Sequence, residues 1–225
     1  MLFKVQAGSD QFISEGYADQ LSAILAAWSV DLLQSPRNTQ VIAQSLAPNF
    51  SGASLRPAQS RIVRSDVLLR IRQNRYSDTP GLNREAFLGE WQAELHDLSK
   101  IIVAEFQITA IEIGKSEGSI QRIHTHVRYE LVASGSGFHR EQRVGNWRIS
   151  WESTVSGEWK IVSWSVLEET QAQASAPVYV DIASAACGRV ESYAAQMLHG
   201  ADYWRTVLDG ASGIDIYGHN GISVA

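Results

Sequence analysis

The chain has 225 residues, of which 44% are hydrophobic and 19% are charged, an ordinary composition for a folded protein. This length allows one large domain, or one domain of about 150 residues with an appendage. The net charge of −5 argues against nucleic acid as a partner, and the single cysteine, Cys187, excludes an intramolecular disulfide and a cysteine-based zinc site.

The start of the chain does not read as a targeting segment. Residues 1–10 lack the apolar run of a secretory signal, and no window is apolar enough to span a membrane. We therefore expect no membrane partner and, by default, a cytoplasmic location.

The first hundred residues have the hydrophobic period of helices. Residues 14–34 predict a long helix and residues 38–47 a shorter one, and a third helix is expected to begin at Asn83. The secondary structure of residues 49–81 is less clear from the sequence. Their alternation weakly favours a strand, and a helix is the alternative. One face of the first helix is apolar through Leu21, Ile24, Leu25, Trp28 and Leu32.

From residue 101 the period changes to two, which predicts strands. Short breaks rich in glycine and serine join them, so neighbouring strands are expected to be antiparallel. The predicted strands are 101–113, 119–133, 139–153 and 158–168. Helices followed by such a meander predict the α+β class, with three helices packed on a curved antiparallel sheet.

This order of elements resembles the nuclear transport factor 2-like family, also described as SnoaL-like or cystatin-like. The resemblance covers about residues 14–170 and includes the closing pattern Gly157-Glu158-Trp159-Lys160-Ile161-Val162-Ser163-Trp164, similar to the family's last strand. It implies a cone-shaped fold with an apolar cavity, in which some members run isomerase or dehydratase chemistry.

Aromatic residues are the candidates for lining such a cavity, and simple filling of the core is the alternative. The candidate pocket residues are Trp28, Trp91, Phe106, Tyr129 and Trp147. No carboxylate is expected on the inward face of the second predicted strand. This face therefore offers no general base, and its absence argues against an isomerase. We therefore assign no catalytic residue and no cofactor.

Two histidines lie on the polar face of the second predicted strand. His124 and His126 have a spacing at which two imidazoles can bind one metal ion. Glu130 lies about 13 Å along the strand from His126, so a third ligand would have to come from a neighbouring strand. The alternative is a solvated or subunit-facing surface. We predict no metal site and keep the two histidines as weak candidates.

Residues 56–75 contain six arginines and one acid, Asp66. Such a segment can hold an anionic ligand or pair with an acidic partner. Solvated strand and loop charges are the alternative interpretation.

The C-terminal part differs in character. Residues 1–170 are expected to form the domain, followed by a linker with short helices over 171–213. Residues 214–225, Ile-Asp-Ile-Tyr-Gly-His-Asn-Gly-Ile-Ser-Val-Ala, resemble the lead-in to an FG-GAP (VCBS-type) repeat. The resemblance implies an incomplete first repeat of a longer protein, whose calcium-binding loops would lie beyond Ala225.

These observations support two hypotheses about function. The first is a non-catalytic interaction or dimerisation module of an FG-GAP repeat protein, forming a homodimer through the sheet face. The alternative is a SnoaL-like small-molecule binding protein, isomerase or dehydratase that takes a small apolar ligand. This alternative requires a cavity of about 300 Å³ or more with a few polar groups.

Overall fold

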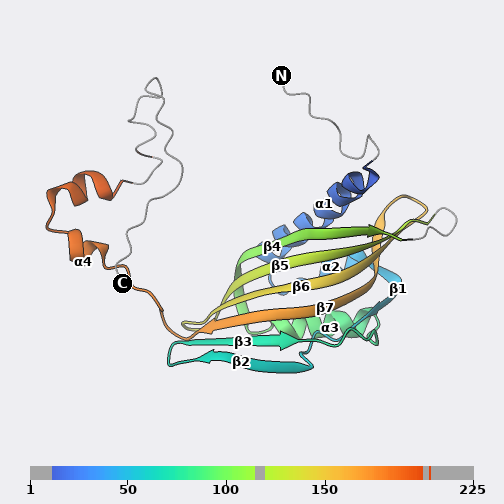
Figure 1. Cartoon of the computed structure of the whole chain (residues 1–225), viewed down its shortest axis with the longest axis horizontal. Helices are drawn as coiled ribbons and strands as arrows, with labels where there is room; N and C mark the ends of the chain where they lie inside the picture. The colour runs from blue at the N-terminus through green and yellow to red at the C-terminus, as the bar shows by residue number, and fades with distance from the viewer. Residues whose placement is uncertain (1–11, 115–119, 200–202, 204–225) are drawn as a thin grey trace, which may run out of the picture. The chain divides into compact units, whose positions relative to one another are not determined.

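A computed structural model describes residues 12–114, 120–199 and 203 of the chain. Its first unit, Met1–Val178, contains helices α1 (Ile13–Gln34), α2 (Gln40–Ser45) and α3 (Arg84–Leu95) and one seven-stranded sheet (Figure 1). The strands are β1 (Leu46–Gly52), β2 (Gln59–Ser65), β3 (Leu69–Arg75), β4 (Leu98–Ile113), β5 (Arg122–Gly135), β6 (Arg140–Ser153) and β7 (Trp159–Ala174). This architecture confirms the predicted α+β class, with helices packed on a curved and mostly antiparallel sheet.

Strand β7 organises the sheet, whose order is β2-β3-β7-β6-β5-β4. One edge of β7 pairs with β6 along its length. Its other edge is divided: residues 161–164 pair with β1 in parallel, and residues 168–174 pair with β3 in antiparallel fashion. The end of β7 is therefore an interior strand, flanked by β6 and β3.

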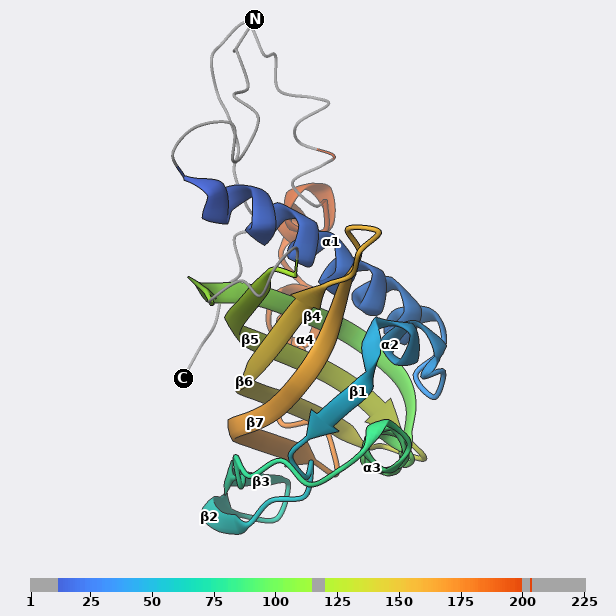
Figure 2. The same cartoon turned by 90° about the vertical axis from the view of Figure 1, so that its right-hand side faces the viewer.

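The sheet bends strongly, and the helices lie along one of its faces (Figure 2). Register shifts interrupt the pairing of β4 with β5 and of β6 with β7. Such bulges insert an extra residue on one strand and increase its local bend. The bend brings side chains from α1, α3 and the inner sheet face into one core.

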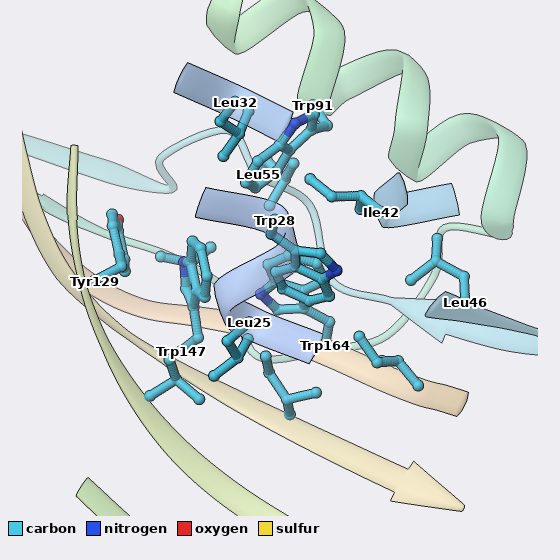
Figure 3. Packing of buried hydrophobic residues seen from close by; sticks show 14 of the residues in the cluster. Leu25, Trp28, Leu32, Ile42, Leu46, Leu55, Trp91, Tyr129, Trp147 and Trp164 are labelled. Atoms are coloured by element: carbon cyan, nitrogen blue, oxygen red, sulfur yellow. The ribbon is translucent and has the colours of Figure 1, made fainter. Parts of the chain in front are cut away.

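Tryptophans fill that core (Figure 3). Trp164 on β7 is fully buried, and its ring centroid lies 5.3 Å from that of Trp28 on α1 and 4.8 Å from that of Trp147 on β6. Tyr129 on β5 continues the row, stacked at 4.3 Å on Trp147. Offset and edge-to-face contacts of this kind add to the free energy gained by burying the rings.

The sequence weakly favours a strand within residues 49–81, and the structure has three strands between α2 and α3. The predicted second helix ends two residues earlier, at Ser45, because Leu46 begins β1. All of β2 is exposed, so it has no buried alternation by which to recognise it. Residues 171–174, expected in the linker, extend β7 and pair with β3 and β6.

The second unit, Tyr179–Ala225, contains a short helix, α4 (Ala183–Cys187), and one π-helical turn, Tyr193–Met197. Residues 214–225, the predicted FG-GAP lead-in, lie outside the described residues, so that interpretation stays a prediction. Across the described part of the chain, no helix is both long and apolar enough to cross a membrane.

Candidate functional site

Four directly paired positions cross the inner face of the sheet where the apolar core ends. Tyr129 on β5 pairs with Gly145 on β6, Gly145 pairs with Glu169 on β7, and Glu169 pairs with Asn74 on β3. Tyr129, Glu169 and Asn74 are 3%, 6% and 4% exposed. A buried carboxylate therefore lies between a phenol and an amide.

The carboxylate of Glu169 is held by three neutral donors. Its Oε1 accepts hydrogen bonds from Asn74 Nδ2 at 3.1 Å and from Tyr76 Oη at 3.1 Å. Its Oε2 accepts one from Tyr129 Oη at 2.8 Å. A carboxylate has about four acceptor positions, so one position on Oε2 remains for a further donor.

Gly145 leaves the space that the phenol of Tyr129 crosses to reach Glu169. A Cβ at this position would lie 2.5 Å from Tyr129 Oη and 2.5 Å from the carbonyl oxygen of Glu168. Glycine is needed here because any side chain would collide with the ring or with the backbone.

We expect Gly145→Ala to lower the free energy of unfolding by about 1–3 kcal/mol through this overpacking, and to displace Tyr129 from Glu169. Chemical denaturation measures the first effect. The control is Gly89→Ala in α3, where a Cβ meets nothing within 4 Å and where alanine favours the helix. Unchanged stability of Gly145→Ala would contradict the close approach.

An ion-pair network adjoins Glu169. Arg143 on β6 donates from Nη1 to Glu94 Oε2 at 2.8 Å, from Nη2 to the backbone oxygen of Glu94 at 3.2 Å, and from Nε to Glu141. Glu141 also accepts hydrogen bonds from Gln171 and Gln173. The side chains of Arg143 and Glu141 are only 12% and 5% exposed, so solvent screens this pair weakly.

The environment shifts several pKa values. Burial raises the pKa of Tyr76 and Tyr129 well above the ordinary value, and the charge of Glu169 raises both further. Burial alone would raise the pKa of Glu141, but Arg143 and the two glutamine amides lower it below its usual value. The acidic neighbours raise the pKa of Arg143 despite its burial. Both phenols therefore keep their protons at neutral pH.

A small cavity of about 40 Å³ lies beside these groups, and an adjoining depression of about 390 Å³ shares part of its lining. Tyr76, Glu94 and Glu169 line both. The cavity exceeds the size needed for one water molecule, about 10–15 Å³, and is far below the 300 Å³ or so of a typical ligand pocket. A ligand would therefore insert only its end into the cavity.

The predicted pocket residues divide into two groups. Trp91, Tyr129 and Trp147 line the small cavity. Trp28 is fully buried against Trp164, and Phe106 packs between Trp28 and Trp147. Tryptophan rings thus occupy the interior of the cone, and the available space lies at its polar end.

The outer face of β5 carries the two histidines. His124 Nδ1 lies 2.9 Å from Ser150 Oγ. Within the described ranges, no group of three or more histidine, cysteine, aspartate or glutamate side chains is arranged to hold a metal ion. The predicted homodimer through this face stays a prediction.

The arginine-rich segment forms the β2–β3 hairpin. Arg64 pairs with Asp66 at 2.9 Å, and Arg61 donates to Gln73. Arg72 belongs to the site, because it lines the depression beside Glu169.

Comparison with known proteins gives likeness of structure alone. No protein-family model and no curated protein matches the sequence. A proposed scytalone dehydratase from Novosphingobium aromaticivorans superposes with a TM-score of 0.46 at 9% identity, over 75% of this chain and 91% of that one. A hexachlorocyclohexane dehydrochlorinase has a TM-score of 0.46 at 6% identity, over 74% and 94%.

A proposed dehydratase of the NTF2-like family from Streptomyces avermitilis has a TM-score of 0.41 at 10% identity, over 68% of this chain and 96% of that one. At such scores and identities the likeness concerns the general arrangement of helices and strands. No activity of this chain follows from it.

Proposed function

We propose that the chain binds a small organic molecule at the polar end of its core and exchanges a proton with it through Glu169. The observation that carries the proposal is the buried carboxylate of Glu169, held by three neutral donors and retaining one acceptor position beside a cavity. A carboxylate positioned in this way is suited to general base chemistry of the isomerase or dehydratase type.

The neighbouring donors suit the same chemistry. Because the pKa values of Tyr76 and Tyr129 are raised, their hydroxyls keep the protons that they donate to Glu169, and these hydrogen bonds hold the carboxylate in place. The buried indole N–H of Trp91, which has no acceptor among the described residues, is a further donor at this cavity.

Size sets the arrangement of the ligand. The inner cavity accepts one or two non-hydrogen atoms, and the adjoining depression, at about 390 Å³, accepts the rest of a small molecule. The reacting end would therefore meet Glu169 while the remainder lies against the β2–β3 hairpin.

Proton transfer can be tested without knowing the natural substrate. The full chain is incubated in deuterated water with small carbonyl compounds, neutral and amino-substituted, and NMR follows exchange of the protons next to the carbonyl. We expect exchange faster than in buffer, and Glu169→Gln to slow it about 100-fold or more, as loss of a general base does.

Glu168→Gln is the matched control, because Glu168 is adjacent in sequence but exposed. Its exchange rate should equal that of the wild type. Exchange no faster than in buffer for every compound, or full activity of Glu169→Gln, would contradict the chemistry. Tryptophan fluorescence measures binding of the same compounds. If none of them binds, the result would favour the non-catalytic interaction module.

A further inference from the structure

We propose that the group entering the small cavity is a protonated amine, so that the ligand class is cationic. This inference rests on the proposed binding site and adds the chemical identity of the ligand's inner end. It is carried by the charges that surround the cavity and by the aromatic side chains that line it.

The charges that line the two spaces are equal in number, Glu94 and Glu169 against Arg143 and Arg72, but Glu169 is not paired. Arg143 forms ion pairs with Glu94 and Glu141. Glu169 is buried and is held by neutral donors, and it belongs to no ion pair among the described residues. A ligand with one positive charge would neutralise this carboxylate, whereas an anionic ligand would place a second unpaired charge beside it.

The titration of the site agrees with an unpaired carboxylate. Burial raises the pKa of Tyr76 and Tyr129, and the negative charge of Glu169 raises both further. The charge of Glu169 also contributes to the raised pKa of Arg143. All three groups therefore respond to the charge of Glu169.

Shape and aromatic contacts favour an ammonium group over other cations. The rings of Tyr76, Trp91, Tyr129 and Trp147 line the cavity, and aromatic faces attract cations. A volume of about 40 Å³ admits an ammonium nitrogen with one carbon and is too small for a trimethylated nitrogen. The ammonium group would lie beside Glu169 and leave the remaining acceptor position of Oε2 to the proton that the carboxylate removes.

A matched set of probes tests the charge preference. Benzylamine, benzyl alcohol, benzoate and benzyltrimethylammonium share one ring and differ in the group that enters the cavity. Titration of the full-length wild type, followed by tryptophan fluorescence and NMR, should show benzylamine binding at least 10-fold tighter than benzyl alcohol. We expect no saturable binding of benzoate or of benzyltrimethylammonium.

A variant pair locates the effect. Glu169→Gln should reduce the preference for benzylamine over benzyl alcohol to less than 3-fold, whereas Glu168→Gln should retain it. The wild-type series needs no variant, so the test stands even if Glu169→Gln fails to fold.

The outcomes separate the two proposals. Equal binding of amine and alcohol, or tighter binding of benzoate, would overturn the cationic ligand class and leave the binding site in place. Binding of none of the four probes would overturn both. Tight binding of benzyltrimethylammonium would refute the small inner cavity as the site of the charge.

Discussion

Replacing Arg143 with methionine is expected to lower the free energy of unfolding by about 3–5 kcal/mol, among the largest effects of any single substitution in this chain. The guanidinium is the cation shared by Glu94 and Glu141, and its side chain is only 12% exposed. Methionine fills a similar volume but leaves two carboxylates without their cation, one of them buried. Urea denaturation at neutral pH measures the loss.

The pH dependence identifies the cause of that loss. In the wild type the pKa of Glu141 is lowered, so its contribution to stability is present above the unfolded pKa and disappears as the pH falls through the folded value. In Arg143→Met, burial instead raises the pKa of Glu141, and protonation relieves the cost. The deficit of the variant should therefore begin to shrink above a pH of about 4.3, the ordinary glutamate value, as the pH falls through the raised pKa of Glu141 in the variant. It should shrink further below about 4.3, as the wild type loses the contribution of its lowered pKa.

A double variant is the control for the buried charge. Replacing Glu141 with leucine in Arg143→Met removes the stranded carboxylate and should recover a large part of the stability. A deficit that is independent of pH, or a double variant as unstable as the single one, would indicate lost packing rather than an unpaired buried charge.

Trp164→Ala is expected to cost about 3–5 kcal/mol, as truncation of a fully buried aromatic side chain does. Trp164 has no exposed surface and contacts four other aromatic rings, those of Trp28, Phe87, Trp91 and Trp147. These rings come from α1, α3 and β6, so the substitution loosens every layer of the core at once.

Thermal and chemical denaturation measure this loss, and Trp164→Phe should show a smaller one because it retains most of the ring contacts. Trp159→Ala is a useful comparison, since Trp159 lies near the margin of the core and donates to Gln20 at 2.8 Å. A cost for Trp164→Ala no greater than that of Trp159→Ala would contradict the central role of Trp164.

Much of the fold follows from hydrophobic period. The first and third helices and the first three long strands were predicted close to their observed bounds, because each buries a set of apolar side chains on one face. The last strand was predicted to end at residue 168 and continues to Ala174. In the hairpin formed by β2 and β3, the alternation is weak in β3 and absent from the exposed β2. The position of the hairpin is set by pairing with β7, which is a tertiary contact.

Glu169 was missed for a reason visible in the register. The inner face of β7 carries Trp164 and Val166, and strict alternation would continue it at Glu168. A register shift between Asn146 and Trp147 leaves Leu167 as an extra residue on β7. Beyond this extra residue, Glu169 and Gln171 lie on the inner face. The prediction of no inward carboxylate concerned the second long strand alone, whereas Glu169 lies on β7.

The dependence of the site on the β2–β3 hairpin links binding to local unfolding. Asn74 and Tyr76 reach Glu169 only while β3 is docked on β7, and all of β2 is exposed, so little burial opposes undocking. Undocking would take two of three donors away from the carboxylate in one step. A ligand that prefers the assembled carboxylate therefore also stabilises the hairpin, and any change that loosens the hairpin weakens affinity without touching the ligand.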